Sequence, residues 1–143
     1  MYDLWAGVCI ATETHLRKPE LDMLQISNYH ILADNCRTTP IGERIGGGVL
    51  ILVHNTLSAV KGDEIQGLEP WVEHCAITLH LSHQESKSIR LSGIYIPPTG
   101  TPATKRKGLE TILAADREKG TEEHPSHILA GDLNVTVWFA AYT

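Results

Sequence analysis

The sequence has no long apolar run, no closely paired cysteines and no excess of positive charge. No stretch is apolar over enough residues to span a bilayer, so a membrane-spanning chain is not expected. The first ten residues carry no lysine or arginine, which removes the positive start of a signal peptide; we expect an intracellular location, with the nucleus as one option. Cys9, Cys36 and Cys75 are odd in number and widely spaced, which indicates buried free thiols instead of a disulfide framework or a zinc site.

The composition is that of one globular domain. The chain has 143 residues, 42% hydrophobic and 20% charged, and a chain of this length buries roughly two thirds of its unfolded surface. A formal net charge of -5 disfavours strong non-specific binding of nucleic acid by the whole surface. It still allows a metal-dependent phosphodiesterase, because such a site needs acidic residues and its basic contacts can be local, as in Lys105-Arg106-Lys107. The same triplet is also typical of a solvated helix start.

Hydrophobic patterning predicts several strands, then one crossover helix, then a last strand. Residues 5–12 and 49–53 are nearly continuous in apolar character, which predicts strands buried on both faces. Residues 72–81 alternate, which predicts a half-exposed strand. The other expected elements are a helical turn at 19–26, strands at 29–33, 88–96 and 128–130, and a helix at 103–119 with Leu109, Ile112 and Leu113 inward. This order is typical of a mixed-sheet α/β chain.

The most informative stretch is the apolar run 128–130 followed by Gly131, Asp132, Leu133 and Asn134. We expect a buried strand that ends at Gly131, so that Asp132 and Asn134 lie just beyond it. In an extended backbone residues two apart point the same way, which would bring the carboxylate and the amide into one pocket. A carboxylate can take a proton from water or hold a hard cation, and an amide can donate to a phosphoryl oxygen. The same residues also suit an ordinary turn after a strand.

Three other features fall near predicted strand ends. Glu13 follows the first strand, where it is either a solvated exit residue or a ligand. Arg37, in a polar loop, is a candidate phosphate contact or a plain surface residue. The glycines at 46–48 precede a strand and lack the helix and Lys-Ser or Lys-Thr of a phosphate-binding loop. They favour a bend where two backbones approach closely.

Four segments in this order resemble the endonuclease/exonuclease/phosphatase superfamily, and most closely the apurinic-type endonuclease domain of non-LTR (LINE-like) retrotransposons. They are CIATETHL at 9–16, GGVLILV at 47–53, LSGIYIPPTG at 91–100 and ILAGDLN at 128–134. Their order and separations make the set specific, and the resemblance covers residues 3–134. It implies an α/β (α+β) fold in which two packed sheets form a β-sandwich flanked by helices, with the site at one edge of the sheets.

The resemblance also implies roles for particular residues. Glu13 matches the family's magnesium ligand, and a single carboxylate with several waters commonly holds Mg²⁺. Asp132 matches the aspartate that orients and deprotonates the attacking water, and Asn134 matches the amide that contacts the scissile phosphate. Tyr95 matches the tyrosine whose hydroxyl supports the phosphoryl group, with a core tyrosine as the alternative. The implied reaction is Mg²⁺-dependent hydrolysis of a phosphodiester, with DNA as the substrate that would be nicked.

The sequence also departs from the family pattern at both ends. The family's first strand, which bears an asparagine of the site, has no counterpart, and neither does its Ser-Asp-His ending. We therefore expect residues 1–134 to form a partial, incomplete domain of this superfamily and residues 135–143 to form a non-matching apolar tail. Three hypotheses follow: a DNA-nicking endonuclease of retrotransposon origin, a catalytically inactive truncated remnant of such a domain, and a phosphatase or exonuclease of the same superfamily.

Overall fold

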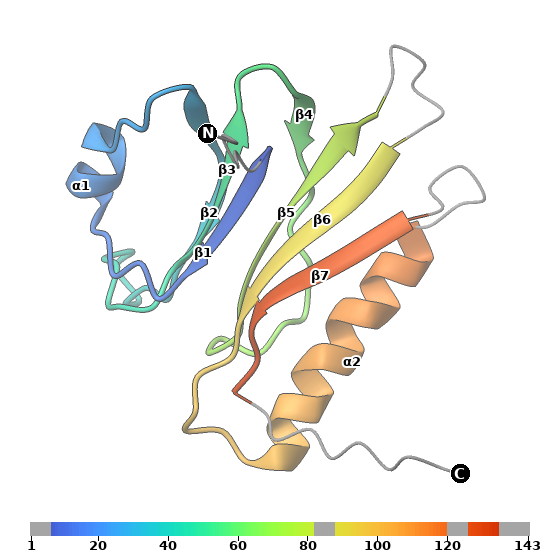
Figure 1. The fold of residues 1–143 in the computed structure, drawn as a ribbon. Helices are drawn as coiled ribbons and strands as arrows, with labels where there is room; N and C mark the ends of the chain where they lie inside the picture. Colours follow the sequence, from blue (N-terminus) through green and yellow to red (C-terminus); the bar gives the residue numbers. More distant parts are fainter. Residues whose placement is uncertain (1–6, 82–87, 120–125, 135–143) are drawn as a thin grey trace, which may run out of the picture.

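Two β-sheets packed face to face and two helices make up residues 7–81, 88–119 and 126–134, the part of the chain described by a computed structural model (Figure 1). The elements in chain order are β1 (Val8–Thr12), α1 (Lys18–Met23), β2 (Tyr29–Asn35), β3 (Val49–His54), β4 (Ser58–Lys61), β5 (Glu73–His80), β6 (Ser88–Tyr95), α2 (Pro102–Lys119) and β7 (Ser126–Asp132). The predicted α+β class with two sheets and flanking helices is confirmed. The predicted tail at 135–143 lies outside the described residues.

The first sheet has the strand order β1-β3-β2, and both pairs are antiparallel. β3 is buried from Val49 to Val53, as its continuous apolar sequence predicted. β5 and β6 lie against one of its faces, and Leu21 of α1 packs on the other. The expectation that β1 is buried on both faces is wrong, because β1 lies at one end of the strand order and its Cys9 is exposed.

The second sheet has the order β4-β5-β6-β7 and is mixed, as predicted (Figure 1). β5 runs antiparallel to β4 and β6, whereas β7 runs parallel to β6. Parallel neighbours need a crossover connection, and α2 lies between them in the chain. β4 was not predicted, because its four residues lie in a segment whose glycines and polar residues indicated turns.

Burial of β5 and β7 differs from the prediction. β5 was expected to be half-exposed, but Glu73 to Ile77 are all buried, because residues of the 65–72 segment and of α2 pack over the outer face of this sheet. β7 was expected to be buried, but Ile128 is 49% exposed. Its position at the end of the strand order explains this exposure.

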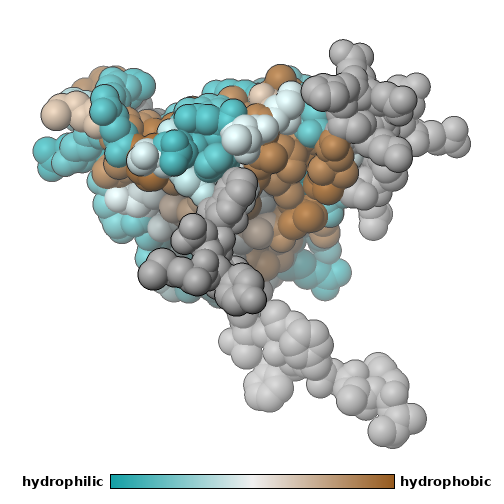
Figure 2. Space-filling model, turned by 45° about the horizontal axis from the view of Figure 1, so that its top comes forward, coloured by the Kyte–Doolittle hydropathy of each residue, from teal (hydrophilic) through white to brown (hydrophobic). Residues whose placement is uncertain are grey.

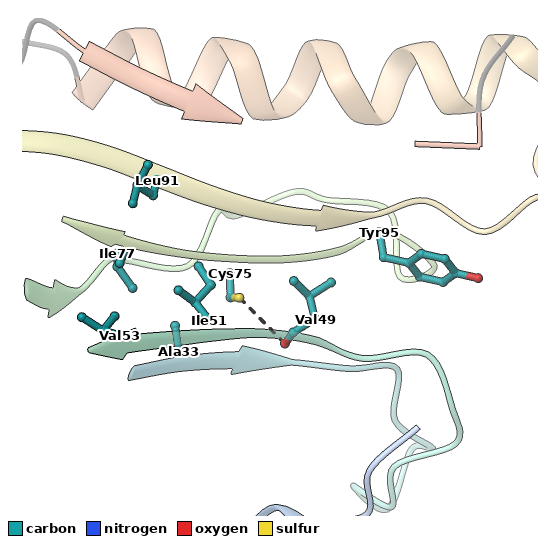
Figure 3. Close-up of a cluster of buried hydrophobic side chains, with 8 residues drawn as sticks. All are labelled: Ala33, Val49, Ile51, Val53, Cys75, Ile77, Leu91 and Tyr95. Atoms are coloured by element: carbon teal, nitrogen blue, oxygen red, sulfur yellow. Dashed lines mark hydrogen bonds between the residues drawn. The ribbon is translucent and has the colours of Figure 1, made fainter. Parts of the chain in front are cut away.

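Two apolar clusters hold the layers together. The first lies between the sheets (Figure 3) and comprises Ala33, Val49, Ile51, Val53, Cys75, Ile77, Leu91 and Tyr95. The second lies between the second sheet and α2 and contains Ile65, Val72, Ile94, Ile96 and Ile112. On α2, the inward prediction is confirmed for Ile112, which is fully buried, and is wrong for Leu113, which is 45% exposed. Within 102–115, the part of the helix whose burial is described, Lys105 and Gly108 take the other buried positions.

The three cysteines are free, as predicted, but they are not all buried. Cys75 is buried in the first cluster, where its thiol lies 3.8 Å from the carbonyl oxygen of Val49 (Figure 3). Burial raises the pKa of Cys75 to about 12. Cys36 is half-buried and Cys9 is exposed on the edge strand. The prediction of buried thiols therefore holds only for Cys75.

The surface mixes hydrophilic and hydrophobic side chains, as one face shows in Figure 2. Large apolar residues that are exposed include Met23, Ile41, Ile45 and Val60. Neither helix of the described ranges is long and apolar enough to cross a membrane.

Candidate active site

Glu73, Tyr95 and Asp132 form a row across the end of the second sheet. Glu73 of β5 pairs in register with Tyr95 of β6, and Tyr95 pairs with Asp132 of β7. Register partners on neighbouring strands present their side chains on the same face of a sheet. Tyr95 belongs to the cluster between the sheets, so this face is turned toward the first sheet. The three residues therefore lie at one end of the space between the sheets.

Tyr95 connects this row to Glu13 of the first sheet. Its hydroxyl donates a hydrogen bond to Oε1 of Glu13, which follows β1 directly and is exposed. The ring is 3% exposed, and in Figure 3 the hydroxyl points away from the aliphatic side chains of the cluster. The burial of Tyr95, together with its hydrogen bond to the Glu13 carboxylate, raises the pKa of Tyr95 to about 12. The hydroxyl therefore keeps its proton at neutral pH and remains a donor.

The glycines at 46–48 form the predicted close approach of two backbones. All three have positive φ angles, 117° at Gly46, 64° at Gly47 and 111° at Gly48, values that L side chains rarely adopt. The carbonyl oxygens of Gly47 and Gly48 accept hydrogen bonds from the backbone N–H groups of His15 (2.7 Å) and Thr14 (3.3 Å). The segment after Glu13 is thus held against the turn that precedes β3.

Glu73 is the functional candidate that the sequence interpretation missed. Its carboxylate is 1% exposed and accepts hydrogen bonds from the backbone N–H of Gly48 at 2.5 Å and from Nε of Arg37 at 2.9 Å. The backbone N–H of Arg37 also approaches it, at 3.3 Å. A signal was present, because Glu73 has the same parity as the inward residues Cys75 and Ile77, and a carboxylate at a core position needs partners.

Arg37, predicted as a candidate phosphate contact, lies in this site through its ion pair with Glu73. The side chain of Arg37 is 33% exposed. Its positive charge also acts on Tyr95, in the direction that lowers the pKa, but burial and Glu13 have larger effects, so the pKa of Tyr95 remains raised. Arg37 is therefore the cation that neutralises a buried carboxylate and stands beside the Tyr95–Glu13 contact.

Asp132 and Asn134 form a tight turn at the end of β7. Oδ1 of Asp132 accepts the backbone N–H of Asn134 at 3.0 Å, which is the side-chain hydrogen bond of an Asx turn. The extended backbone assumed from the sequence does not reach Asn134, because its φ is 45°. Its Nδ2 instead donates to the carbonyl oxygen of Ile96 at 3.0 Å. The turn and a functional role are compatible, since Asp132 still lies beside Tyr95.

Gly131 and Lys105 fix this turn from two sides. Gly131 has a φ of 145°, and a Cβ there would overlap the carbonyl oxygen of Ile94. Lys105, only 8% exposed, donates from Nζ to the carbonyl oxygen of Asn134 at 2.6 Å. The rest of the basic triplet matches a solvated helix start, because Arg106 and Lys107 form exposed ion pairs with Glu110 and Glu69.

A hydrated magnesium ion fits the donors at this edge better than an ion that needs several side-chain ligands. Across the described ranges, no three His, Cys, Asp or Glu side chains form a group that could hold a metal. Glu13 is an exposed carboxylate whose Oε1 accepts a hydrogen bond from Tyr95, and Mg²⁺ is commonly held by one or two carboxylates and several waters. Glu13 is therefore the residue that would hold Mg²⁺. Nδ1 of His15 accepts a hydrogen bond from the backbone N–H of Gly47 (3.3 Å).

Comparison with known proteins gives no family for this chain. No protein-family model matches the sequence, and a search of curated proteins finds no significant match.

Proposed function

We propose that this chain is a Mg²⁺-dependent phosphodiester hydrolase that nicks DNA, derived from the endonuclease domain of a non-LTR retrotransposon. The observation that carries the proposal is the contact of Tyr95 with Glu13, beside Asp132 in register on the next strand. These residues come from three distant parts of the chain. They match the motif positions that the resemblance assigns to phosphodiester hydrolysis.

Asp132 is the base in this proposal. It is a half-buried carboxylate at the end of a strand, and its Oδ1 is fixed by the N–H of Asn134. A carboxylate held in this way can orient a water molecule and take its proton as the water attacks phosphorus. The amide of Asn134 carries two N–H donors, so it has one donor beyond its bond to Ile96 with which to contact a phosphoryl oxygen.

The phosphate of the substrate would be bound by the groups of three further residues, Glu13, Tyr95 and Arg37. Tyr95 orients the Glu13 carboxylate through its hydroxyl group. When the hydroxyl proton turns toward the substrate instead, the same group donates a hydrogen bond to the phosphoryl group. Arg37 adds a positive charge at the same edge, suited to a phosphate oxygen. Mg²⁺ held by Glu13 would offset negative charge on the phosphate and on the leaving oxygen.

Nicking of supercoiled plasmid by the purified chain in Mg²⁺ tests this proposal. Glu13→Ala and Asp132→Asn should each lower the rate about a hundred-fold or more, since general base catalysis alone contributes at least this much. Asp22→Ala is the matched control, because Asp22 is an exposed carboxylate paired with Lys18 on α1. Absence of nicking, or nicking that survives both substitutions, would refute the proposal and leave the motifs as those of an inactive remnant. Release of mononucleotides from linear DNA, or of inorganic phosphate from a monoester, would instead identify an exonuclease or a phosphatase.

A further inference from the structure

We infer that Glu73 is a positioning residue that sets the place of the Glu13 carboxylate through the glycine turn at 46–48. The inference deepens the proposed function and rests on it, because it assigns a role to a residue that no motif of the sequence indicated. Glu73 is 1% exposed, and a carboxylate taken out of water is retained only where charge and hydrogen bonds compensate it.

The two oxygens of Glu73 have different partners. Oε2 accepts the N–H of Gly48, whereas Oε1 accepts Nε and the backbone N–H of Arg37. The carboxylate therefore joins the loop that follows β2 to the turn that precedes β3. An amide side chain could not replace it in both contacts, because one of its two ends would present N–H groups toward a donor.

The turn transmits this constraint to Glu13. The backbone of Gly47 and Gly48 accepts the N–H groups of His15 and Thr14, the residues directly after Glu13. Glu13 itself has a φ of 52° and His15 a φ of 51°, conformations that cost energy for residues with a side chain and persist only where the surroundings hold them. The chain of contacts runs from Glu73 to Gly48, then to Thr14, and so to Glu13.

Close packing leaves little freedom at each contact. A Cβ on Gly47 would lie 2.6 Å from Oε2 of Glu73, and one on Gly48 would overlap Oγ1 of Thr14. The turn is therefore pressed against Glu73 on one side and against the segment after Glu13 on the other. Loss of the Glu73 carboxylate should loosen the turn and, with it, the geometry of the Glu13–Tyr95 contact.

Amide hydrogen exchange of the full chain, measured by NMR, tests the inference without any need for turnover. In Glu73→Gln, amide exchange at Thr14, His15 and Gly48 should become about ten-fold faster or more, as expected for a local opening. Exchange at the core residues Ile51 and Ile77 should change no more than it does in the control variant Asp34→Asn. Asp34→Asn is the matched control, because Asp34 also forms a half-buried ion pair with an arginine, Arg44, at 2.7 Å.

A second readout reports on Glu13 itself. Mg²⁺ added to the wild type should shift the amide signal of Glu13, and Glu73→Gln should need about ten-fold more Mg²⁺ for the same shift, the size typical for loss of a supporting contact. Asp34→Asn should need no more Mg²⁺ than the wild type. If the wild-type chain binds Mg²⁺ but does not nick DNA, the proposed function fails while these two measurements still decide the role of Glu73.

Three results would overturn the inference. One is exchange at His15 and Gly48 that rises no more in Glu73→Gln than in Asp34→Asn. Another is a uniform rise that includes Ile51 and Ile77, since that would mean Glu73 only stabilises the whole fold. The third concerns the wild type and decides the case if neither Glu73→Gln nor Glu73→Ala folds. The Gly48 amide of the wild type should be protected from exchange, because it donates a hydrogen bond to Glu73. Fast exchange of this amide would contradict that hydrogen bond and overturn the inference.

Discussion

Replacement of Gly47 by alanine should destabilise the protein more than replacement of Gly42 by alanine. Both glycines have positive φ angles, 64° and 85°, so both substitutions impose a similar backbone strain. Their surroundings differ. A Cβ on Gly47 would lie 2.6 Å from Oε2 and 2.7 Å from Cδ of the buried Glu73, whereas a Cβ on Gly42 would have nothing within 4 Å.

The expected magnitudes follow from these surroundings. A left-handed conformation costs an L residue about 1–2 kcal/mol, and this is the whole effect expected for Gly42→Ala. In Gly47→Ala the new methyl group must also displace a carboxylate that accepts hydrogen bonds from Gly48 and Arg37. Hydrogen bonds to a charged group contribute roughly 1.5–3 kcal/mol each, so the loss of one adds about 1.5–3 kcal/mol.

Urea unfolding followed by far-ultraviolet circular dichroism measures the difference. With a denaturant dependence of about 2 kcal/mol/M, the midpoint of Gly47→Ala should lie about 0.7–1.5 M below that of Gly42→Ala. An equal denaturant dependence would show that the two variants expose the same amount of surface on unfolding. Equal midpoints would refute the reasoning, because they would mean that the Glu73 carboxylate moves aside without loss.

Three further predictions concern the core and the titrating groups. Ile112→Ala should cost about 3 kcal/mol in urea unfolding, whereas Leu113→Ala should cost less than about 1 kcal/mol, since Ile112 is fully buried and Leu113 is 45% exposed; similar costs would contradict the assigned helix face. In the native protein iodoacetamide should modify Cys9 well before Cys75, as read by mass spectrometry of peptides, because Cys9 is exposed and burial raises the pKa of Cys75 to about 12; equal rates would contradict the burial of Cys75. The raised pKa of Tyr95, about 12, means that the unfolded chain loses this proton first, so the free energy of unfolding should fall as the pH rises from about 10 to about 12. Tyr95→Phe should reduce that fall in urea midpoints measured across this range, and an unchanged slope would contradict the shift.

The burial of β3 was predictable from its own residues, whereas the similar apolar run of β1 is not buried on both faces, because β1 lies at the end of its strand order. β3 carries five consecutive apolar residues and lies at the centre of its sheet, where both faces are covered. The burial of β5 and β7 was not predictable in the same way, because it depends on which other layers cover them. Alternation along β5 could not show that the 65–72 segment and α2 would pack over the outer face of the sheet, and His74 on that face is buried.

Some residues of the candidate site were predictable from the sequence, and others were not, for similar reasons. Glu13, Tyr95 and Asp132 were identified because each is a chemically distinctive residue at or near a strand end within a motif. Glu73 was missed because its partners Arg37 and Gly48 lie 36 and 25 positions away. No local sequence pattern indicates contacts over such separations. Asn134 was assigned an extended backbone, whereas the local hydrogen bond to Asp132 bends the chain into a turn.

The contact between Glu13 and Tyr95 also bears on the order of folding. The two residues are 82 positions apart, and closure of so long a loop is entropically costly, so such contacts follow local ones and slow the folding reaction. The pairing of β7 beside β6 must likewise wait until α2 has crossed back over the sheet. The hairpin of β5 and β6 can form early, while the site that would carry the chemistry exists only once Glu13 and Asp132 have both come to lie beside Tyr95.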